Sequence, residues 1–198
     1  VRDLLECCEE QSGEYSKKSV LEVFESPEDH LKQEQLKWLE QISALRRLLL
    51  FLIYAIGFIF VKIYFRLTVE GEENLEGEEP LIIAPNHSSY LDPFLLGLSI
   101  PFKKLKNIFW AGYKGIAFGN SATRFGSRTA QGIPIDPFED IASSFALGAS
   151  VLNRGHRLVW FPEGERSHTG ELVDFKQGIG LLSVKTGTPI VPVFIDGA

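Results

Sequence analysis

Short apolar runs alternate with segments of helical pattern through most of this 198-residue sequence, and this alternation constrains the fold more than any other feature. Brief apolar runs bounded by proline, glycine or polar residues predict strands at 67–70, 81–84, 108–110, 133–135, 157–161 and 190–195. Helices are expected after Asp92-Pro93, over 141–152 and over 179–186. Strands that alternate with helices are typical of an α/β fold, in which a sheet is flanked by helices.

The most apolar segment is residues 48–61, which are fourteen residues without a charge between Arg46-Arg47 and Lys62. As a helix this segment spans about 21 Å, less than the hydrocarbon core of a bilayer at about 30 Å. Extension to Phe65 gives eighteen residues but includes Lys62. The pattern favours a helix embedded in a membrane or lying at its interface. The alternative is a buried core helix, because length alone does not separate the two.

The region before this segment predicts a helical N-terminal part. Ser26-Pro27 is typical of a helix start, with a capping hydroxyl followed by proline. An apolar stripe from Leu31 to Leu45 predicts an amphipathic linker helix. We therefore expect three parts: the end of a preceding domain at 1–25, a linker helix and membrane-associated helix at 26–66, and the main domain at 67–198. The first residue is Val1 and the chain contains no methionine, so we expect a fragment whose main domain is shortened at its C-terminal end.

Composition excludes several classes of protein. The only cysteines, Cys7 and Cys8, are adjacent, which excludes a disulfide framework, and no metal-ligand spacing is present. These features fit a compartment that faces the reducing cytosol. The sequence contains no phosphate loop of the Walker type, no dinucleotide fingerprint and no Gly-x-Ser-x-Gly nucleophile motif.

The net charge of −6 hides a basic stretch. Six bases and no acid lie between Asp92 and Asp136. Such a stretch attracts an anionic surface or a phosphorylated ligand, or it is simply a solvated face. It lacks the interleaved aromatic residues of a nucleic-acid platform, so no nucleic-acid partner is expected.

One candidate for chemistry is the block Asn-His-Ser-Ser-Tyr-Leu-Asp at 86–92, between a buried strand and a helix. A loop of this length brings the Asp92 carboxylate to a ring nitrogen of His87, whose other nitrogen then accepts a proton from a substrate hydroxyl. The alternative is a capping histidine with a structural aspartate.

A second polar block, Phe-Pro-Glu-Gly-Glu-Arg-Ser at 161–167, also follows an apolar strand. Arg166 and Ser167 offer hydrogen-bond donors that suit a phosphate, and Gly164 permits a close approach of the backbone. Glu163 could orient the arginine or a substrate hydroxyl. The alternative is an ordinary polar turn.

Together with residues 124–136 and 188–193, these blocks resemble the glycerolipid acyltransferase family, which includes 1-acylglycerol-3-phosphate acyltransferases. The Asn-His-x4-Asp block matches the family's catalytic motif, and 161–167 is similar to its Phe-Pro-Glu-Gly-Thr-Arg-Ser motif. The resemblance covers roughly 67–198 and implies that His87 and Asp92 are catalytic. It implies acceptor binding by a further set of residues: Glu163, Gly164, Arg166 and Ser167.

The implied reaction is transfer of a fatty acyl group from a thioester to a hydroxyl of a lysophospholipid at the cytoplasmic face of a membrane. The donor is acyl-CoA or an acyl carrier protein, with no bound cofactor and no metal. Residues 1–10 are similar to the last helix of an acyl carrier domain, which makes such a domain a candidate partner. The rival interpretation is a non-catalytic module that binds membrane lipids, and a third is hydrolysis with water as acceptor.

The sequence departs from the family pattern at two positions. Glu165 stands where the family usually has threonine, and Asp136 stands where its second motif commonly ends in arginine. Arg124 and Arg128 are the residues that can substitute for that arginine in acceptor binding. Both departures leave room for an acceptor other than lysophosphatidate.

Overall fold

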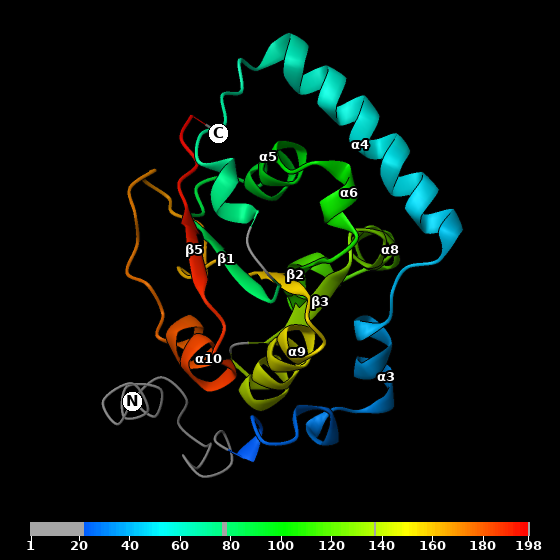
Figure 1. The fold of residues 1–198 in the computed structure, drawn as a ribbon, viewed down its shortest axis with the longest axis vertical. Helices are drawn as coiled ribbons and strands as arrows, with labels where there is room; N and C mark the ends of the chain where they lie inside the picture. Colours follow the sequence, from blue (N-terminus) through cyan, green and yellow to red (C-terminus); the bar gives the residue numbers. More distant parts are fainter. Residues whose placement is uncertain (1–21, 77–78, 137, 198) are drawn as a thin grey trace.

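The computed structural model of the chain describes residues 22–76, 79–136 and 138–197, in which five parallel strands form one sheet flanked by helices (Figure 1). The strand order is β3-β2-β4-β1-β5. This architecture confirms the α/β fold class. The strands are β1 (Leu81–Pro85), β2 (Ile108–Tyr113), β3 (Gly132–Ile135), β4 (Arg157–Val159) and β5 (Ile190–Val193).

Helices cover both faces of the sheet because successive side chains of a strand point to opposite faces. On one face Ile82, Phe109 and Leu158 join the buried cluster that includes α9 (Ile141–Asn153) and α10 (Gly178–Thr186). On the other face Ile83 and Val159 join a cluster with α5 (Asp92–Ser99) and α6 (Phe102–Leu105). The sheet is therefore apolar on both sides, as its short uninterrupted runs predict.

The strand order places three loops side by side. β1 lies between β4 and β5, and Ile83 is in register with Val159 on one side and Val191 on the other. Because all three strands are parallel, their carboxyl ends lie at the same edge of the sheet. The segments that follow β1, β4 and β5 therefore meet there.

The segment after Ser26 differs from the single amphipathic helix that the sequence predicts. It forms η1 (Pro27–His30), α3 (Gln33–Leu36) and η2 (Lys37–Leu39), and then has no regular structure up to Ser43. Leu31 and Leu39 are buried in the same cluster as α9. The chain follows the surface of the domain to bury these side chains, and a straight helix does not do so.

The apolar run forms α4 (Ala44–Tyr64), which begins after the N-cap residue Ser43. Of the side chains of α4 only Val61 is buried. The alternative of a buried core helix is therefore wrong. Among the described residues, α4 is the one helix long and apolar enough to cross a membrane by length and composition.

One side of α4 rests on the domain. The Tyr54 hydroxyl donates to the carbonyl of Ile100 at 3.2 Å, and the rings of Phe51 and Phe102 lie 5.1 Å apart. Gly57 lies against Leu98, where an added methyl group would come within 3.3 Å of that side chain. The middle of α4 is thus attached to the region of α5 and α6, past which the helix runs in Figure 1.

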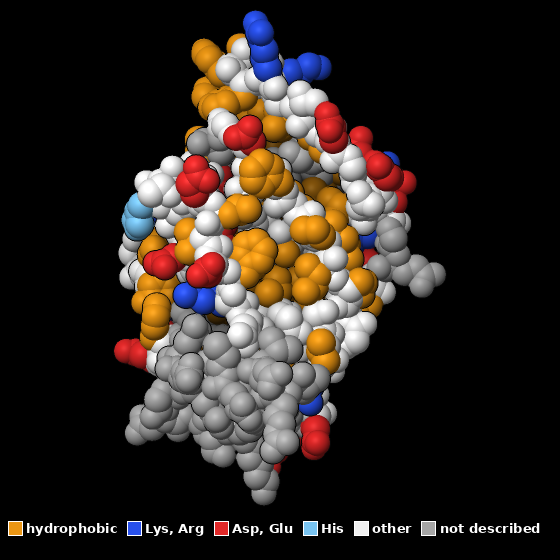
Figure 2. All heavy atoms as spheres, turned by 90° about the vertical axis from the view of Figure 1, so that its left-hand side faces the viewer, with side chains coloured by type: hydrophobic (Ala, Val, Ile, Leu, Met, Phe, Trp, Pro, Cys, Tyr) orange, Lys and Arg blue, Asp and Glu red, His pale blue; other side chains and the backbone are white. Residues whose placement is uncertain are grey.

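The remaining elements are η3 (Glu72–Leu75), α7 (Lys114–Ala117) and α8 (Ser121–Thr129). The strand predicted at 67–70 is wrong, because these residues have no regular structure. The helical pattern predicted at 1–10 lies outside the described residues. Figure 2 shows hydrophobic side chains gathered on the side of the molecule where β5 and α10 lie, and the exposed apolar residues of this part of the chain are Leu172, Phe175, Val184, Ile190 and Phe194.

Candidate active site

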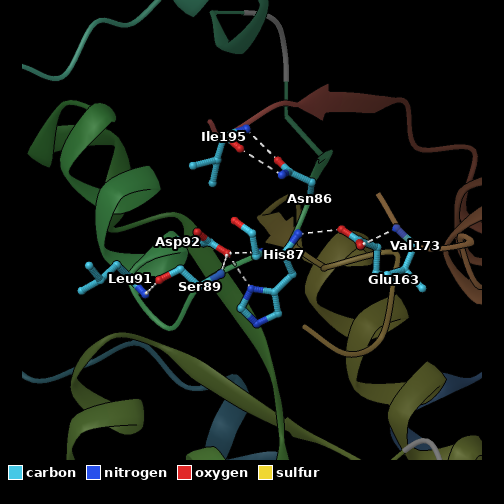
Figure 3. Close-up of polar contacts among 9 residues, drawn as sticks. Asn86, His87, Ser89, Leu91, Asp92, Glu163, Val173 and Ile195 are labelled. Atoms are coloured by element: carbon cyan, nitrogen blue, oxygen red, sulfur yellow. Dashed lines mark hydrogen bonds and ion pairs between the residues drawn. The ribbon is translucent and has the colours of Figure 1, made fainter. Parts of the chain in front are cut away.

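The loop after β1 is anchored to the end of β5. The Asn86 side chain donates from Nδ2 to the carbonyl of Ile195 at 3.0 Å and accepts from the Ile195 N–H at 2.6 Å (Figure 3). The Asn86 side chain thus takes the place of a backbone partner and extends the pairing of β1 with the chain after β5. It fixes the backbone immediately before His87.

His87 and Asp92 are in direct contact, as their spacing predicts. The Nδ1 atom of His87 lies 2.8 Å from Oδ2 of Asp92 (Figure 3). The Asp92 side chain is fully buried, whereas His87 keeps 18% of its side-chain surface exposed. An ionised carboxylate can only accept, so Nδ1 carries the proton in this contact and Nε2 is left as the acceptor of a neutral ring. Among the described residues, Nε2 has no hydrogen-bond partner.

The Asp92 carboxylate also shapes the loop that carries His87. Its Oδ2 atom accepts from the N–H groups of Ser88 and Ser89, each at 2.7 Å. Asp92 lies in the first turn of α5, followed by Pro93, a position that favours both an acid and a proline. The carboxylate is therefore held by the backbone while it orients the imidazole.

Glu163 lies where its carboxylate ties two loops together. It follows β4, is fully buried, and accepts from the His87 N–H at 2.6 Å and from the Val173 N–H at 2.9 Å (Figure 3). Both oxygens are occupied by backbone donors. The structure thus gives Glu163 a structural contact, and its expected contact with a substrate hydroxyl or with the arginine stays a prediction.

The rest of the 161–167 loop completes the frame around His87. The Ser167 N–H donates to the His87 carbonyl at 2.7 Å, and the ring of Phe161 lies 4.2 Å from the His87 ring, centroid to centroid. Gly164 has φ +74°, a left-handed backbone conformation that residues with a side chain rarely adopt. Arg166 points to the His87 loop, where its guanidinium stacks on the Tyr90 ring.

Arg124 and Arg128, both on α8, are placed differently from each other. Arg124 is exposed, and its side chain makes no hydrogen bond or ion pair among the described residues. Arg128 donates to the carbonyls of Glu40 at 2.9 Å and Trp38 at 3.4 Å. Burial, and then the nearby charge of Arg46, lower the pKa of Arg128. The Arg128 guanidinium thus holds the linker before α4 and is not brought to His87.

Asp136, which stands in the place of the family's arginine, has a local role. Its Oδ1 atom accepts from the N–H groups of Phe138 and Glu139, which closes the turn before α9. Within the described part of the chain, no group of three or more His, Cys, Asp and Glu residues is placed to hold a metal ion. The chemistry that the site offers is a hydrogen-bonded imidazole with one free nitrogen, and an arginine that stacks on the same loop.

Comparison with known proteins identifies the class that this fold and site define. Residues 66–196 match the family model named Acyltransferase, so the chain belongs to that family. It is 30% identical over 162 residues to the human 1-acyl-sn-glycerol-3-phosphate acyltransferase alpha, which covers 79% of this chain and 52% of that protein. It is 34% identical over 135 residues to the Saccharomyces cerevisiae 1-acyl-sn-glycerol-3-phosphate acyltransferase, covering 65% and 42%.

A solved structure shares the fold. The crystal structure of the 1-acyl-sn-glycerophosphate acyltransferase PlsC from Thermotoga maritima aligns with a TM-score of 0.54 and 24% identity, covering 74% of this chain and 57% of that one. This chain spans about half the length of the curated relatives that it matches.

Substitution of Glu163 tests its structural role. In Glu163→Gln an amide NH2 must face one of two backbone N–H donors, and a buried donor left without a partner costs about 1–3 kcal/mol. We expect the free energy of unfolding, measured with denaturant, to fall by about that amount. Glu165→Gln removes an exposed carboxylate two residues away and should change stability by no more than about 0.5 kcal/mol. Equal stability of the two variants would contradict the role of Glu163.

Substitution of Arg128 tests whether its guanidinium stabilises the fold or binds the acceptor. Arg128→Gln removes the charged donors to the Trp38 and Glu40 carbonyls and should lower stability by about 1–2 kcal/mol. The affinity for a lysophospholipid, measured by titration calorimetry, should stay unchanged. Arg124→Gln on the same helix is the control for loss of charge. Weakened lysophospholipid binding without loss of stability would instead place Arg128 at the acceptor.

Proposed function

We propose that this chain is an O-acyltransferase that moves a fatty acyl group from a thioester to a hydroxyl of a glycerol-phosphate lysophospholipid. The observation that carries the proposal is the contact of His87 Nδ1 with the buried Asp92 carboxylate, which leaves Nε2 free at the carboxyl edge of the sheet. Membership of the Acyltransferase family and the names of the relatives support the same reaction.

His87 acts as the general base of the reaction. Its Nε2 atom takes the proton of the acceptor hydroxyl as the hydroxyl oxygen attacks the thioester carbonyl. The tetrahedral intermediate then collapses, the C–S bond breaks, and the departing thiolate takes the proton back from the imidazolium. Asp92 holds the ring in the tautomer that this step needs and stabilises the imidazolium. The products are an ester and a thiol.

Arg166 is the group that holds the acceptor phosphate. Its guanidinium offers a planar fork of donors that suits a phosphate. The left-handed Gly164 permits the turn that brings Arg166 beside the His87 loop. Ser167 is 7% exposed and acts mainly through its backbone, which holds the His87 carbonyl. The exposed Glu165 next to Arg166 is the feature by which this chain departs from the family pattern.

The donor is an acyl thioester of coenzyme A or of an acyl carrier protein, and no bound cofactor takes part in the step. As part of this proposal, an acyl carrier domain is a candidate partner that supplies the thioester, because residues 1–10 are similar to the last helix of such a domain. Residues 67–198 form the acyltransferase domain.

α4 anchors the enzyme at the cytoplasmic face of a membrane. Six of its exposed apolar side chains recur every three or four residues and so form one stripe: Leu45, Leu48, Leu52, Ile56, Ile59 and Ile63. Other apolar side chains beside the stripe are exposed as well: Phe51, Ile53, Phe58 and Phe60. The domain is contacted through Phe51, Tyr54 and Gly57 in the middle of the helix. A helix held against a globular domain is suited to lie in the interface with its apolar stripe toward the acyl chains.

A basic hollow lies at the N-terminal end of α4. It has a volume of about 250 Å³, with an apolar lining from Ile42, Leu50 and Phe102. Its three cations are Arg47, Lys103 and Lys106, and no acid lines it. Cations at the membrane surface attract anionic lipid head groups. The hollow therefore supports membrane contact at this end of α4.

The rival function is a lipid-binding module without catalysis. It requires no free base, whereas the structure holds an oriented imidazole whose Nε2 has no partner among the described residues. Hydrolysis of the thioester uses the same base with water, and it differs from transfer only in the acceptor.

Acyl transfer is tested in mixed micelles with acyl-CoA or an acyl carrier thioester and a panel of lysophospholipids. We expect an acylated lipid product that requires the acceptor. His87→Ala should lower the rate by about 10²–10⁴-fold, because it removes general base catalysis. The measurement is separation and quantification of acylated lipid and free fatty acid.

His30→Ala, at an exposed histidine of η1, is the matched control and should keep the activity of the parent. Equal activity of His87→Ala and the parent would contradict the role of His87. Free fatty acid formed at the same rate with and without acceptor would identify a hydrolase. Lipid binding with neither product would identify the binding module.

Membrane contact at the hollow is tested by sedimentation with phosphatidylcholine vesicles, with and without phosphatidylglycerol. Each surface cation contributes about 1 kcal/mol, so Lys103→Gln with Lys106→Gln should weaken binding to anionic vesicles about ten- to thirtyfold. The control, Lys37→Gln with Lys185→Gln, removes the same charge from exposed lysines elsewhere. Equal weakening in both pairs would mean that overall charge, and not the hollow, attracts the membrane.

A further inference from the structure

Arg166 is stacked on an aromatic ring from the loop that carries the proposed base. Its guanidinium carbon lies 3.6 Å from the centroid of the Tyr90 ring. Tyr90 belongs to the loop between β1 and α5, whereas Arg166 belongs to the loop after β4. A guanidinium over the face of a tyrosine ring is an attractive cation–π contact. The stack therefore connects the two loops through side chains as well as through the backbone.

The stack leaves the donors of Arg166 unused. Among the described residues, the Arg166 side chain forms no hydrogen bond and no ion pair, and neighbouring Glu165 does not pair with it. Arg154, by contrast, uses its guanidinium for structure: it donates to the Glu28 carboxylate and to the carbonyl of Leu39. Stacking occupies the face of a guanidinium, while its N–H groups lie in the plane and point outward. Arg166 thus presents a free fork of donors at a fixed place.

We propose that Tyr90 is a positioning residue that holds Arg166 in the orientation in which it binds the phosphate of the acceptor. This inference rests on the proposed function. A free arginine side chain samples many rotamers, and part of its binding energy is lost when a ligand immobilises it. Tyr90 removes that loss in advance because its ring already fixes the guanidinium.

The same geometry links phosphate binding to the reacting hydroxyl. Tyr90 lies two residues before Asp92 and three after His87. The Ser88 and Ser89 N–H groups within this loop are bonded to the Asp92 carboxylate, which ties the loop to the first turn of α5. One short loop therefore carries the base and positions the phosphate-binding arginine. An acceptor has to place its phosphate at Arg166 and its hydroxyl at His87 at the same time, and the glycerol backbone sets the distance between these two groups.

The test is steady-state kinetics with a monoacyl glycerol phosphate as the varied acceptor. In Tyr90→Ala, loss of the stack should raise KM for this acceptor about two- to tenfold, with kcat changed less than twofold. The Tyr90 hydroxyl forms no hydrogen bond among the described residues, so Tyr90→Phe keeps the ring and should behave as the parent. Phe94→Ala, at an exposed aromatic residue of α5 that lies under no cation, is the control and should leave KM unchanged.

A double-mutant cycle shows whether Tyr90 acts through Arg166. Tyr90→Ala should have no further effect on KM when it is added to Arg166→Gln. A KM unchanged in Tyr90→Ala, or a fall in kcat alone, would overturn the inference while the transferase stands. A further rise in KM on the Arg166→Gln background would overturn it too. Absence of acyl transfer in the parent protein would overturn the proposed function and the inference with it.

Discussion

The site depends on two hydrogen bonds to the backbone of a single residue. The His87 N–H is bound by the buried Glu163 carboxylate, and its carbonyl is bound by the N–H of Ser167. Both partners lie in the loop after β4, the strand next to β1 in the sheet. These bonds hold the loop of the base to the loop of the proposed phosphate ligand. Because the bond to the Glu163 carboxylate is charge-assisted and buried, it is a strong one, and it holds the two motifs together.

The sequence predicts the local part of this arrangement well. His87 and Asp92 are five residues apart in a loop between a strand and a helix, and their contact follows from that spacing. The role of Glu163 could not be predicted, since it requires β4 to lie beside β1 although Glu163 and His87 are 76 positions apart in the sequence. In the sequence, a glutamate that contacts an arginine or a substrate hydroxyl looks the same as one that accepts from buried backbone N–H groups. Only the burial of Glu163 distinguishes them.

The elements of the fold show the same limit. The strands of the sheet are predicted because their runs are apolar on both faces and bounded by turns. The segment at 67–70 has a similar pattern, yet it gains no partner strand and remains irregular. The linker after Ser26 has a helical stripe, but Leu31 and Leu39 reach the core more effectively along a broken path. The family resemblance makes Arg128 a candidate for acceptor binding, and in the structure its guanidinium binds the carbonyls of that linker. In each case long-range packing overrides a local pattern.

α5 connects the proposed membrane anchor with the proposed base. Its first turn contains Asp92, and its last turn meets α4, where Leu98 packs against Gly57. Eight helical residues span about 12 Å, so the base lies at a short and fixed distance from the anchor. Under the proposed function, the acyl tail of the acceptor stays among the lipid acyl chains while its head group reaches His87. The absence of a side chain at Gly57 lets α5 approach α4 closely, and a large residue there would push α4 away from Leu98 and so from the proposed catalytic pair. In this proposal, the depth of the site relative to the membrane depends on helix packing rather than on the loops that carry the chemistry.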